Sequence, residues 1–290
     1  MNPYLLSLIL GVIEGLTEFL PVSSTAHLRI CEALLGVSLG DGYWKMFSIV
    51  IQLGAILCLP IYFRERLGRF LKTFPRGEHG ESTALTHPLT LVMVAFVCTA
   101  GPAYLLTKVI GKHLESLLIM GVALVVGGVI MWVVDALYAH GTLPRKTDRL
   151  EGMRFGQAVW IGLCQILSAV FPGTSRSMST IAAGQLAGMS RPAALEFSFL
   201  VSIPTMVAAT LYDLYRSIHP HHGEPSILGQ IEWTTQGWVT LGIGFVVSFV
   251  VAYFVVAWFM SWVRSRGFVP FAIYRILVGA AVLVWLVKGH

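Results

Sequence analysis

The chain has 290 residues, of which 56% are hydrophobic and only 12% are charged. Soluble domains carry about 25% charged residues, so this chain has too little polar surface for a water-soluble globule. The same shortage of charge excludes a disordered protein and a nucleic-acid-binding one. We therefore expect a protein that crosses a membrane several times, and the excess of 20 Lys and Arg over 15 Asp and Glu is interpreted first as a topology signal.

Six stretches are apolar and long enough to cross a hydrocarbon core of about 30 Å, which takes about 20 helical residues. In chain order they cover residues 43–63, 88–108, 115–137, 193–215, 237–263 and 269–287. Two further apolar regions are interrupted, residues 3–35 by Pro21 and residues 155–187 by Pro172 and Gly173. Each half is too short to span, so we expect re-entrant helix hairpins. The predicted fold is an all-α polytopic membrane protein with six transmembrane helices and two such hairpins.

Lys and Arg residues are unevenly distributed over the predicted loops. Most of them fall in residues 64–87, 138–154, 188–192 and 264–268. These four loops lie on one side of the membrane if residues 3–35 enter and leave on the other. Because positively charged loops favour the cytoplasm, this pattern predicts that the four loops are cytoplasmic and that both termini are outside.

The two interrupted regions resemble each other at an offset of 151 residues, Gly162 against Gly11. Gly11, Glu14, Pro21 and Ser24 of the first region match Gly162, Gln165, Pro172 and Ser175 of the second. An odd number of crossings separates the copies, so they enter from opposite faces. The chain is therefore interpreted as one domain, residues 1–290, built as an inverted repeat whose broken helices meet near the midplane. Repeat 1 covers about 3–138, a cytoplasmic linker 139–153 and repeat 2 about 154–288.

The first interruption carries an acidic pair and a hydroxyl group. Glu14 and Glu18 are four residues apart on one helical face, and carboxylates within a membrane segment indicate a function. They either share a proton or hold a divalent cation; the alternative is a position at a water interface. Ser24 and His27 follow, and this set is typical of acid–base or nucleophilic chemistry. The alternative for Ser23 or Ser24 is a plain helix cap.

The second interruption carries a cation among hydroxyl groups. A helix N-terminus beside an Arg holds phosphate oxygens well, and Arg176 is the candidate cation. Candidate substrate-binding residues are Gly173, Thr174, Ser175, Arg176, Ser177 and Thr180. Arg176 has a structural alternative, an ion pair with Glu14 or Glu18. Arg275, inside the last predicted span, either reaches the interface or lines the cavity. Gln52 and Glu196 also lie inside spans and are candidates for supporting roles.

An acidic break and a cationic break that meet near the midplane would suit a polyanion bridged to the carboxylates by Mg²⁺ or Ca²⁺. Phosphoryl transfer is the reaction that such positioning and charge neutralisation serve. The alternative function is a transporter or flippase of an anionic lipid or solute, because inverted repeats with broken helices are also typical of transporters.

The stretches EGLTEFLPVSSTAHL (14–28) and PGTSRSMST (172–180) resemble the two signature regions of the undecaprenyl-diphosphatase family, also called the bacitracin-resistance protein family. The similarity runs along nearly the whole chain. The resemblance implies a membrane hydrolase that converts undecaprenyl diphosphate to undecaprenyl phosphate and inorganic phosphate. Such an enzyme recycles the lipid carrier of bacterial cell-wall (peptidoglycan) synthesis and confers bacitracin resistance.

The resemblance also assigns roles to residues. It implies Glu18, Ser24, His27 and Arg176 as catalytic residues, and Glu14 with Glu18 as ligands of a divalent cation, Mg²⁺ or Ca²⁺. The nucleophile is Ser24, His27 or water. The expected location is the bacterial cytoplasmic membrane, with the active site toward the external (periplasmic) face and a homodimer as a further expectation. One departure is Met178, where the pattern has a Gly; it concerns helix packing more than catalysis.

Overall fold

The structure is a computed structural model that describes residues 2–37, 42–78, 80, 82–106, 116–143, 145–219 and 234–288. This part of the chain forms eleven α-helices, one short 3₁₀ helix and no named strand. The elements are α1 (Pro3–Thr17), α2 (Ser24–Leu34), α3 (Gly42–Tyr62), α4 (Arg64–Thr73), α5 (Pro88–Leu105), α7 (Leu117–Ala139), η1 (Leu150–Gly152), α8 (Phe155–Val170), α9 (Arg176–Leu186), α10 (Arg191–Ile218), α11 (Thr235–Ser265) and α12 (Val269–Val287).

Six of these helices, α3, α5, α7, α10, α11 and α12, are long and apolar enough to cross a membrane, and they are the six segments that the hydropathy predicts. The observed helix ends differ from the predicted ones by a few residues. Capping decides where a helix begins, and hydropathy does not register it. The Ser190 side chain accepts a hydrogen bond from the Ala193 amide, so α10 begins at Arg191 and not at residue 193. Residues 107, 108 and 115 of the predicted spans lie outside the described residues. The protein is an all-helical, multi-pass membrane protein.

Both interrupted regions form a pair of short helices. The helices α1, α2, α8 and α9 have 15, 11, 16 and 11 residues, and at about 1.5 Å per residue none spans about 30 Å. The second helix of each pair is capped by a serine in a positive-φ conformation, Ser23 at 74° and Ser175 at 71°, which costs about 1–3 kcal/mol. The local counterpart of Ser175 is therefore Ser23 and not Ser24, because Ser175 follows Pro172 by three positions whereas Ser23 follows Pro21 by two.

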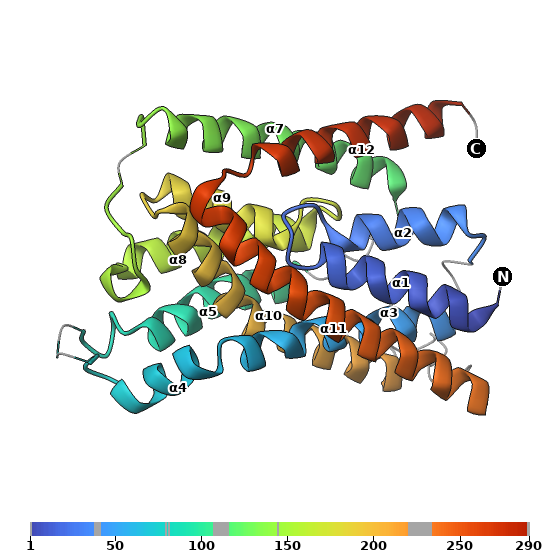
Figure 1. The fold of residues 1–290 in the computed structure, drawn as a ribbon, viewed down its shortest axis with the longest axis horizontal. Helices are drawn as coiled ribbons and strands as arrows, with labels where there is room; N and C mark the ends of the chain where they lie inside the picture. Colours follow the sequence, from blue (N-terminus) through green and yellow to red (C-terminus); the bar gives the residue numbers. More distant parts are fainter. Residues whose placement is uncertain are drawn as a thin grey trace.

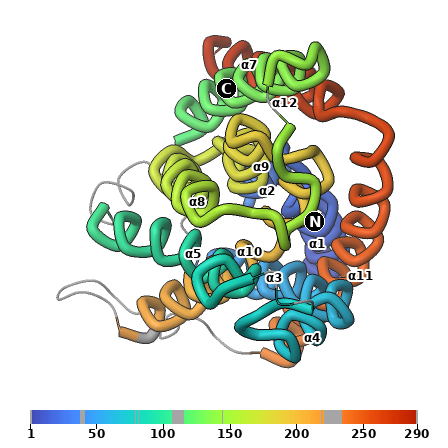
Figure 2. The backbone as a smooth tube through the Cα atoms, turned by 90° about the vertical axis from the view of Figure 1, so that its left-hand side faces the viewer, coloured from blue at the N-terminus to red at the C-terminus, as the bar shows by residue number. Residues whose placement is uncertain are grey.

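The broken pairs lie at the centre of the molecule. In Figure 2, α1, α2, α8 and α9 lie between the α7–α12 pair and the layer that contains α3 and α10, with α11 beside α1 and α5 beside α8. Figure 1 shows the α1–α2 and α8–α9 connections approaching each other in the middle. The matched glycines explain the close packing: a Cβ at Gly11 would lie 2.9 Å from the Gly244 carbonyl of α11, and one at Gly162 would lie 2.5 Å from the Ala95 carbonyl of α5.

The four basic loops meet at one end of the helical bundle. Arg66 at the start of α4 pairs with Glu151 of η1 at 2.7 Å and with Glu196 of α10 at 2.8 Å. Arg191 pairs with Asp135 at 2.7 Å, and the same carboxylate accepts a hydrogen bond from the Phe268 amide. Ion pairs and hydrogen bonds thus connect the loops that the charge count groups together. Glu196, a candidate for a supporting role at the site, is part of this distant cluster.

Candidate active site

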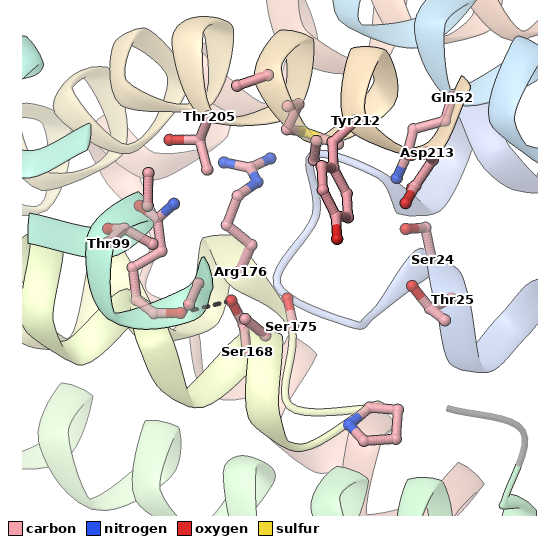
Figure 3. A pocket seen from close by; sticks show the side chains of 18 of the residues that line it. Ser24, Thr25, Gln52, Thr99, Ser168, Ser175, Arg176, Thr205, Tyr212 and Asp213 are labelled. Carbon is pink, nitrogen blue, oxygen red and sulfur yellow. Dashed lines mark hydrogen bonds between the residues drawn. The ribbon is translucent and has the colours of Figure 1, made fainter. Parts of the chain in front are cut away.

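A cavity of about 570 Å³ lies between α5, α8 and α10, and the two helix breaks form part of its wall (Figure 3). Its apolar lining comes mostly from α5 and α10, with residues such as Phe96, Ala103, Met206 and Ala209. Its polar lining includes Glu18, Ser23, Ser24 and Thr25 of the first break, Gly173, Ser175 and Arg176 of the second, and Gln52, Thr99, Gln165, Ser168, Thr205, Tyr212 and Asp213 of the surrounding helices. The cavity is therefore amphipathic, with both helix breaks represented in its polar part.

Three of the expected catalytic residues form a continuous set of contacts in this cavity. The Ser24 hydroxyl donates a hydrogen bond to Glu18 Oε2 at 2.6 Å. The other carboxylate oxygen, Oε1, accepts from Arg176 Nη2 at 3.4 Å. Glu18 is only 6% exposed, so these interactions act with little screening by water. A hydroxyl that donates to a carboxylate is the arrangement of a nucleophile with its base.

Arg176 is the first residue of α9, and its side chain crosses the cavity toward α10 (Figure 3). The Ser175 hydroxyl caps this helix by accepting from the Met178 amide. Arg176 Nη1 also donates to the Ser198 carbonyl at 3.3 Å, while Nε is buried with no hydrogen-bond partner among the described residues. The guanidinium thus forms an ion pair with Glu18, one of the two partners that the sequence offered. Its Nε–H group remains available to donate to an anion.

Glu14 lies behind Glu18, outside the lining of the cavity. Its side chain is 1% exposed, and neither carboxylate oxygen has a hydrogen-bond partner among the described residues. The Glu18 and Glu32 carboxylates are its acidic neighbours. Glu14 therefore influences the cavity through Glu18, its neighbour one helical turn away.

His27 does not line the cavity. Its Nδ1 lies 2.7 Å from the Ser23 carbonyl and its Nε2 lies 2.8 Å from the Tyr274 hydroxyl, and the two rings are stacked. Three of the four expected catalytic residues, Glu18, Ser24 and Arg176, thus meet in the cavity, and His27 does not. Both ring nitrogens of His27 are thus engaged, Nδ1 by the carbonyl that precedes its own helix and Nε2 by Tyr274 of α12.

The candidate residues of the second break have different positions. Gly173 and Ser175 line the cavity with Arg176, whereas Thr174, Ser177 and Thr180 do not. The Ser177 hydroxyl donates to the Leu20 carbonyl at 2.9 Å and joins the two breaks, and the Thr180 and Ser198 hydroxyls lie 2.7 Å apart. Met178 is buried outside the cavity lining and packs toward Gly127 of α7, so this departure from the family pattern affects helix packing.

Arg275 neither reaches the interface nor lines the cavity, so both sequence-based interpretations are wrong. Its side chain is fully buried and donates to the carbonyls of Pro21 at 3.0 Å, Gly173 at 3.1 Å and Thr174 at 2.9 Å, and of Ala123 in α7 at 3.2 Å. Broken helices leave carbonyls without intrahelical partners, and a guanidinium offers five donors to satisfy them. Arg275 connects the two breaks, which explains why a cation lies inside an apolar span.

Replacing this residue should destabilise the protein. We expect Arg275→Met to lower the free energy of unfolding by about 3 kcal/mol or more, because it leaves several buried carbonyls without donors. Thermal unfolding in detergent measures the effect. Arg275→Lys is the matched control: it keeps the charge but lacks the planar fork, so its transition temperature should be intermediate. A wild-type transition temperature for Arg275→Met would contradict the role assigned to Arg275.

Three residues of the cavity wall were not predicted as site residues from the sequence. Asp213 and Tyr212 of α10 line the cavity near Ser24 and Gln52 in the view of Figure 3. An acidic residue inside the predicted span 193–215 is itself a signal of function, and it identifies Asp213. Gln165, noted only as the match of Glu14, also lines the cavity. Gln52 lies in the cavity wall, as a supporting role requires.

The fold and the cavity define a multi-pass membrane protein with an amphipathic cavity in which a carboxylate, a hydroxyl group and a guanidinium group are in contact. A family model described as "Bacitracin resistance protein BacA" matches residues 7–281. The chain belongs to this family. It is 67% identical over 288 residues to an undecaprenyl-diphosphatase of Koribacter versatilis (strain Ellin345), covering 99% of this chain and 100% of the relative.

More distant relatives carry the same name. The chain is 37% identical to an undecaprenyl-diphosphatase of Caldanaerobacter subterraneus subsp. tengcongensis, covering 95% of this chain and 93% of the relative. It is 38% identical to one of Persephonella marina, covering 97% of this chain and 98% of the relative. The similarity therefore extends over nearly the full length of the chains, and the residues that the family model matches include both helix breaks.

Proposed function

We propose that this protein hydrolyses undecaprenyl diphosphate to undecaprenyl phosphate and inorganic phosphate, and thereby recycles the lipid carrier of cell-wall synthesis and confers bacitracin resistance. The relatives' names support the substrate. The observation that carries the proposal is the contact of Ser24 and Arg176 with the same Glu18 carboxylate in one cavity. The relatives' names also favour hydrolysis over the transporter alternative.

In the proposed mechanism, Arg176 and the N-terminus of α9 bind oxygens of the terminal phosphate. The Ser24 oxygen attacks the distal phosphorus and its proton passes to Glu18. The bond from that phosphorus to the bridging oxygen breaks, and the electron pair leaves with undecaprenyl phosphate. Water then hydrolyses the phosphoserine and releases inorganic phosphate. The 2.6 Å hydrogen bond from Ser24 to Glu18 favours this route over direct attack by water, and favours Glu18 over His27 as the proton acceptor.

Phosphate release from undecaprenyl diphosphate by the purified protein in detergent tests the function. We expect the wild type to release phosphate and Ser24→Ala to lose nearly all activity, and a rapid acid quench of the wild type to trap phosphate on Ser24. A Ser24→Ala variant with the wild-type rate would reject the serine nucleophile and leave water as the attacking group. Lipid transfer between the leaflets of a liposome without phosphate release would reject hydrolysis in favour of the transporter.

A divalent cation, Mg²⁺ or Ca²⁺, is part of this proposal. Among the described residues no group of three His, Cys, Asp or Glu side chains is placed to hold a metal. The residues nevertheless fit a cation bound largely by substrate oxygens and water, which is usual for Mg²⁺: Glu18 faces the cavity, and Glu14 behind it has two unpartnered oxygens. When bound, the cation would neutralise charge on the diphosphate.

Removing the cation should therefore abolish activity. We expect an excess of EDTA to stop phosphate release because the diphosphate then enters an acidic pocket without charge compensation. Addition of Mg²⁺ or Ca²⁺ in excess should restore the rate, while a monovalent salt at equal ionic strength serves as the control. Full activity after exhaustive chelation would reject the cation.

We further propose that the two broken pairs are re-entrant hairpins of an inverted repeat within a single domain. Two observations support this. The packing partners are exchanged between the halves: α1 packs on α11 while α8 packs on α5, and α3 packs on α10 while α7 packs on α12. Both breaks also end in a serine of positive φ. A pseudo-twofold axis that relates α5 to α11 and α3 to α10 would produce this pattern.

The proposed location is the bacterial cytoplasmic membrane, with the cavity open to the external face. The basic loops meet at one end of the bundle, which the distribution of Lys and Arg assigns to the cytoplasm. Both α5 and α10 begin at this basic end and run toward the opposite, external face. The cavity is lined by residues in their second halves, 96–104 and 205–213. Accessibility of an introduced cysteine at Tyr104 to an impermeant reagent in whole cells checks this orientation, and light scattering in detergent checks the expected homodimer.

A further inference from the structure

One buried polar side chain in the cavity has no role in the proposed mechanism. Gln165 lies in α8, lines the cavity and is 1% exposed. Neither the oxygen nor the nitrogen of its amide has a hydrogen-bond partner among the described residues. An unpartnered amide in a membrane-embedded site is unfavourable because nothing replaces its lost hydration. Its presence points to a ligand that supplies the missing partner.

The position of Gln165 does not depend on its own amide. The Gly162 carbonyl on the preceding turn of α8 accepts a hydrogen bond from the Thr99 hydroxyl of α5 at 2.8 Å, and Gly162 itself packs against Ala95. The Ser168 hydroxyl donates to the main-chain carbonyl of Gln165 at 2.7 Å, not to its side-chain amide. Gly162 thus joins α8 to α5 without the Gln165 amide, which is left available within the cavity.

A second unpartnered group in the same cavity indicates the chemistry of the ligand. Arg176 Nε is also buried without a hydrogen-bond partner among the described residues. Two unpartnered donors, one of them cationic, suit an anion with several acceptor oxygens. The matching position in the first half carries Glu14, whose negative charge would repel such an anion, whereas the neutral amide of Gln165 offers two N–H donors.

We propose that Gln165 is a substrate-binding residue whose amide donates a hydrogen bond to a non-bridging phosphate oxygen of the diphosphate, alongside Arg176. The same contact holds inorganic phosphate before it leaves. This inference rests on the proposed function for the identity of the substrate. It assigns the anion-binding role to the second half of the chain, while the first half supplies the acidic group and the hydroxyl.

Two variants separate binding from structure. Gln165→Met keeps the approximate size of the side chain and removes both polar atoms. We expect it to raise KM for undecaprenyl diphosphate and the inhibition constant of inorganic phosphate about ten- to hundredfold, the effect of losing one hydrogen bond to a charged group, with a smaller change in kcat. Its transition temperature should stay unchanged or rise, because no internal hydrogen bond is lost. Gln165→Glu should weaken phosphate binding further by adding a like charge.

Gln157 provides the matched control on the same helix. Its amide donates to the Ala187 carbonyl at 2.8 Å and its oxygen accepts from the Arg154 amide at 2.8 Å, and it does not line the cavity. Gln157→Met should therefore lower the transition temperature and leave the inhibition constant of phosphate unchanged. Gln165→Met should therefore weaken phosphate binding without lowering stability, and Gln157→Met should lower stability without weakening phosphate binding.

Calorimetric binding of inorganic phosphate to the wild type and to Gln165→Met gives a readout that does not require turnover. Weaker binding by the variant supports the inference, even if the wild type releases no phosphate, an outcome that would reject the proposed function alone. Equal phosphate affinity and equal KM in an active protein would overturn the inference. A lowered transition temperature with unchanged phosphate affinity would also overturn it and would make Gln165 a structural residue.

Discussion

Glu18→Gln should lower the turnover number for phosphate release by at least about a thousandfold. The substituted amide keeps the shape of the side chain but cannot accept the proton of Ser24, and general-base catalysis alone contributes about 10²–10⁴-fold. The change also removes the negative charge that Arg176 contacts at 3.4 Å. The loss should appear in kcat more than in KM, because the missing interaction is with the reacting groups. Phosphate release from undecaprenyl diphosphate measures both constants.

Glu14→Gln is the matched control for this experiment. The same chemical change occurs one helical turn away, at a carboxylate that does not line the cavity and contacts neither Ser24 nor Arg176 through a hydrogen bond. We expect its effect on kcat to be at least tenfold smaller than that of Glu18→Gln, on the scale set by general-base catalysis. Excess Mg²⁺ should restore a loss in Glu14→Gln that comes from weaker cation binding. Near-wild-type turnover by Glu18→Gln, or a loss in Glu18→Gln that excess Mg²⁺ restores, would contradict the assignment of Glu18 as the base.

The second large effect is expected for Arg176→Lys, which should lower kcat/KM about 10²–10³-fold, the usual cost of losing one group that stabilises the charge of the transition state. The ammonium keeps the positive charge but cannot contact the Glu18 carboxylate, the Ser198 carbonyl and a phosphate with one planar fork. Because the Arg176 contacts include both the base and the expected phosphate position, the change should affect kcat and KM together.

Arg66→Lys tests whether this loss is specific to the cavity. Arg66 also binds carboxylates through a planar fork, those of Glu151 and Glu196, but at the end of the bundle where the basic loops meet. We expect Arg66→Lys to keep the wild-type kcat/KM and to lower the transition temperature slightly. An Arg176→Lys variant with kcat/KM close to that of the wild type would show that charge alone suffices and that the guanidinium geometry has no role.

The proposed function implies an active site with unequal halves. The first break supplies a carboxylate and a hydroxyl, and the second supplies a guanidinium and, by our inference, an amide. The carboxylate at position 14 has an amide, Gln165, as its match, and only the amide lines the cavity. Two breaks of similar backbone geometry, with serine caps of φ 74° and 71°, thus present opposite charges to one cavity.

Local features of the sequence were sufficient to predict the six spans and the two broken pairs, but not α4, which forms within the predicted loop 64–87. Hydropathy over about 20 residues identifies all six membrane-spanning helices, because the cost of placing polar groups in lipid depends on each segment alone. Pro21 and Pro172 likewise mark the two breaks, since a proline cannot donate the hydrogen bond that would continue a helix. The motifs around these breaks contain Glu18, Ser24 and Arg176, which the structure brings together in the cavity. The one-residue error in matching Ser24 with Ser175 arose because a constant offset in sequence does not register the extra residue between Pro172 and Ser175.

Contacts between distant segments depended on how the helices pack. Glu18 and Arg176 are separated by 158 positions, and the sequence offered their ion pair only as one alternative, with Glu14 as the other possible partner. Arg275 reaches the Pro21 carbonyl across 254 positions, a pair that no local pattern specifies. His27 contacts Tyr274 of α12, 247 positions away in the chain, and does not line the cavity with Ser24. The cavity is enclosed by α5, α8, α10 and the two breaks, so Gln165 and Asp213 line one site only in three dimensions. The cost of burying a group is set by its own chemistry, whereas the partner that offsets this cost is set by the packing of the whole chain.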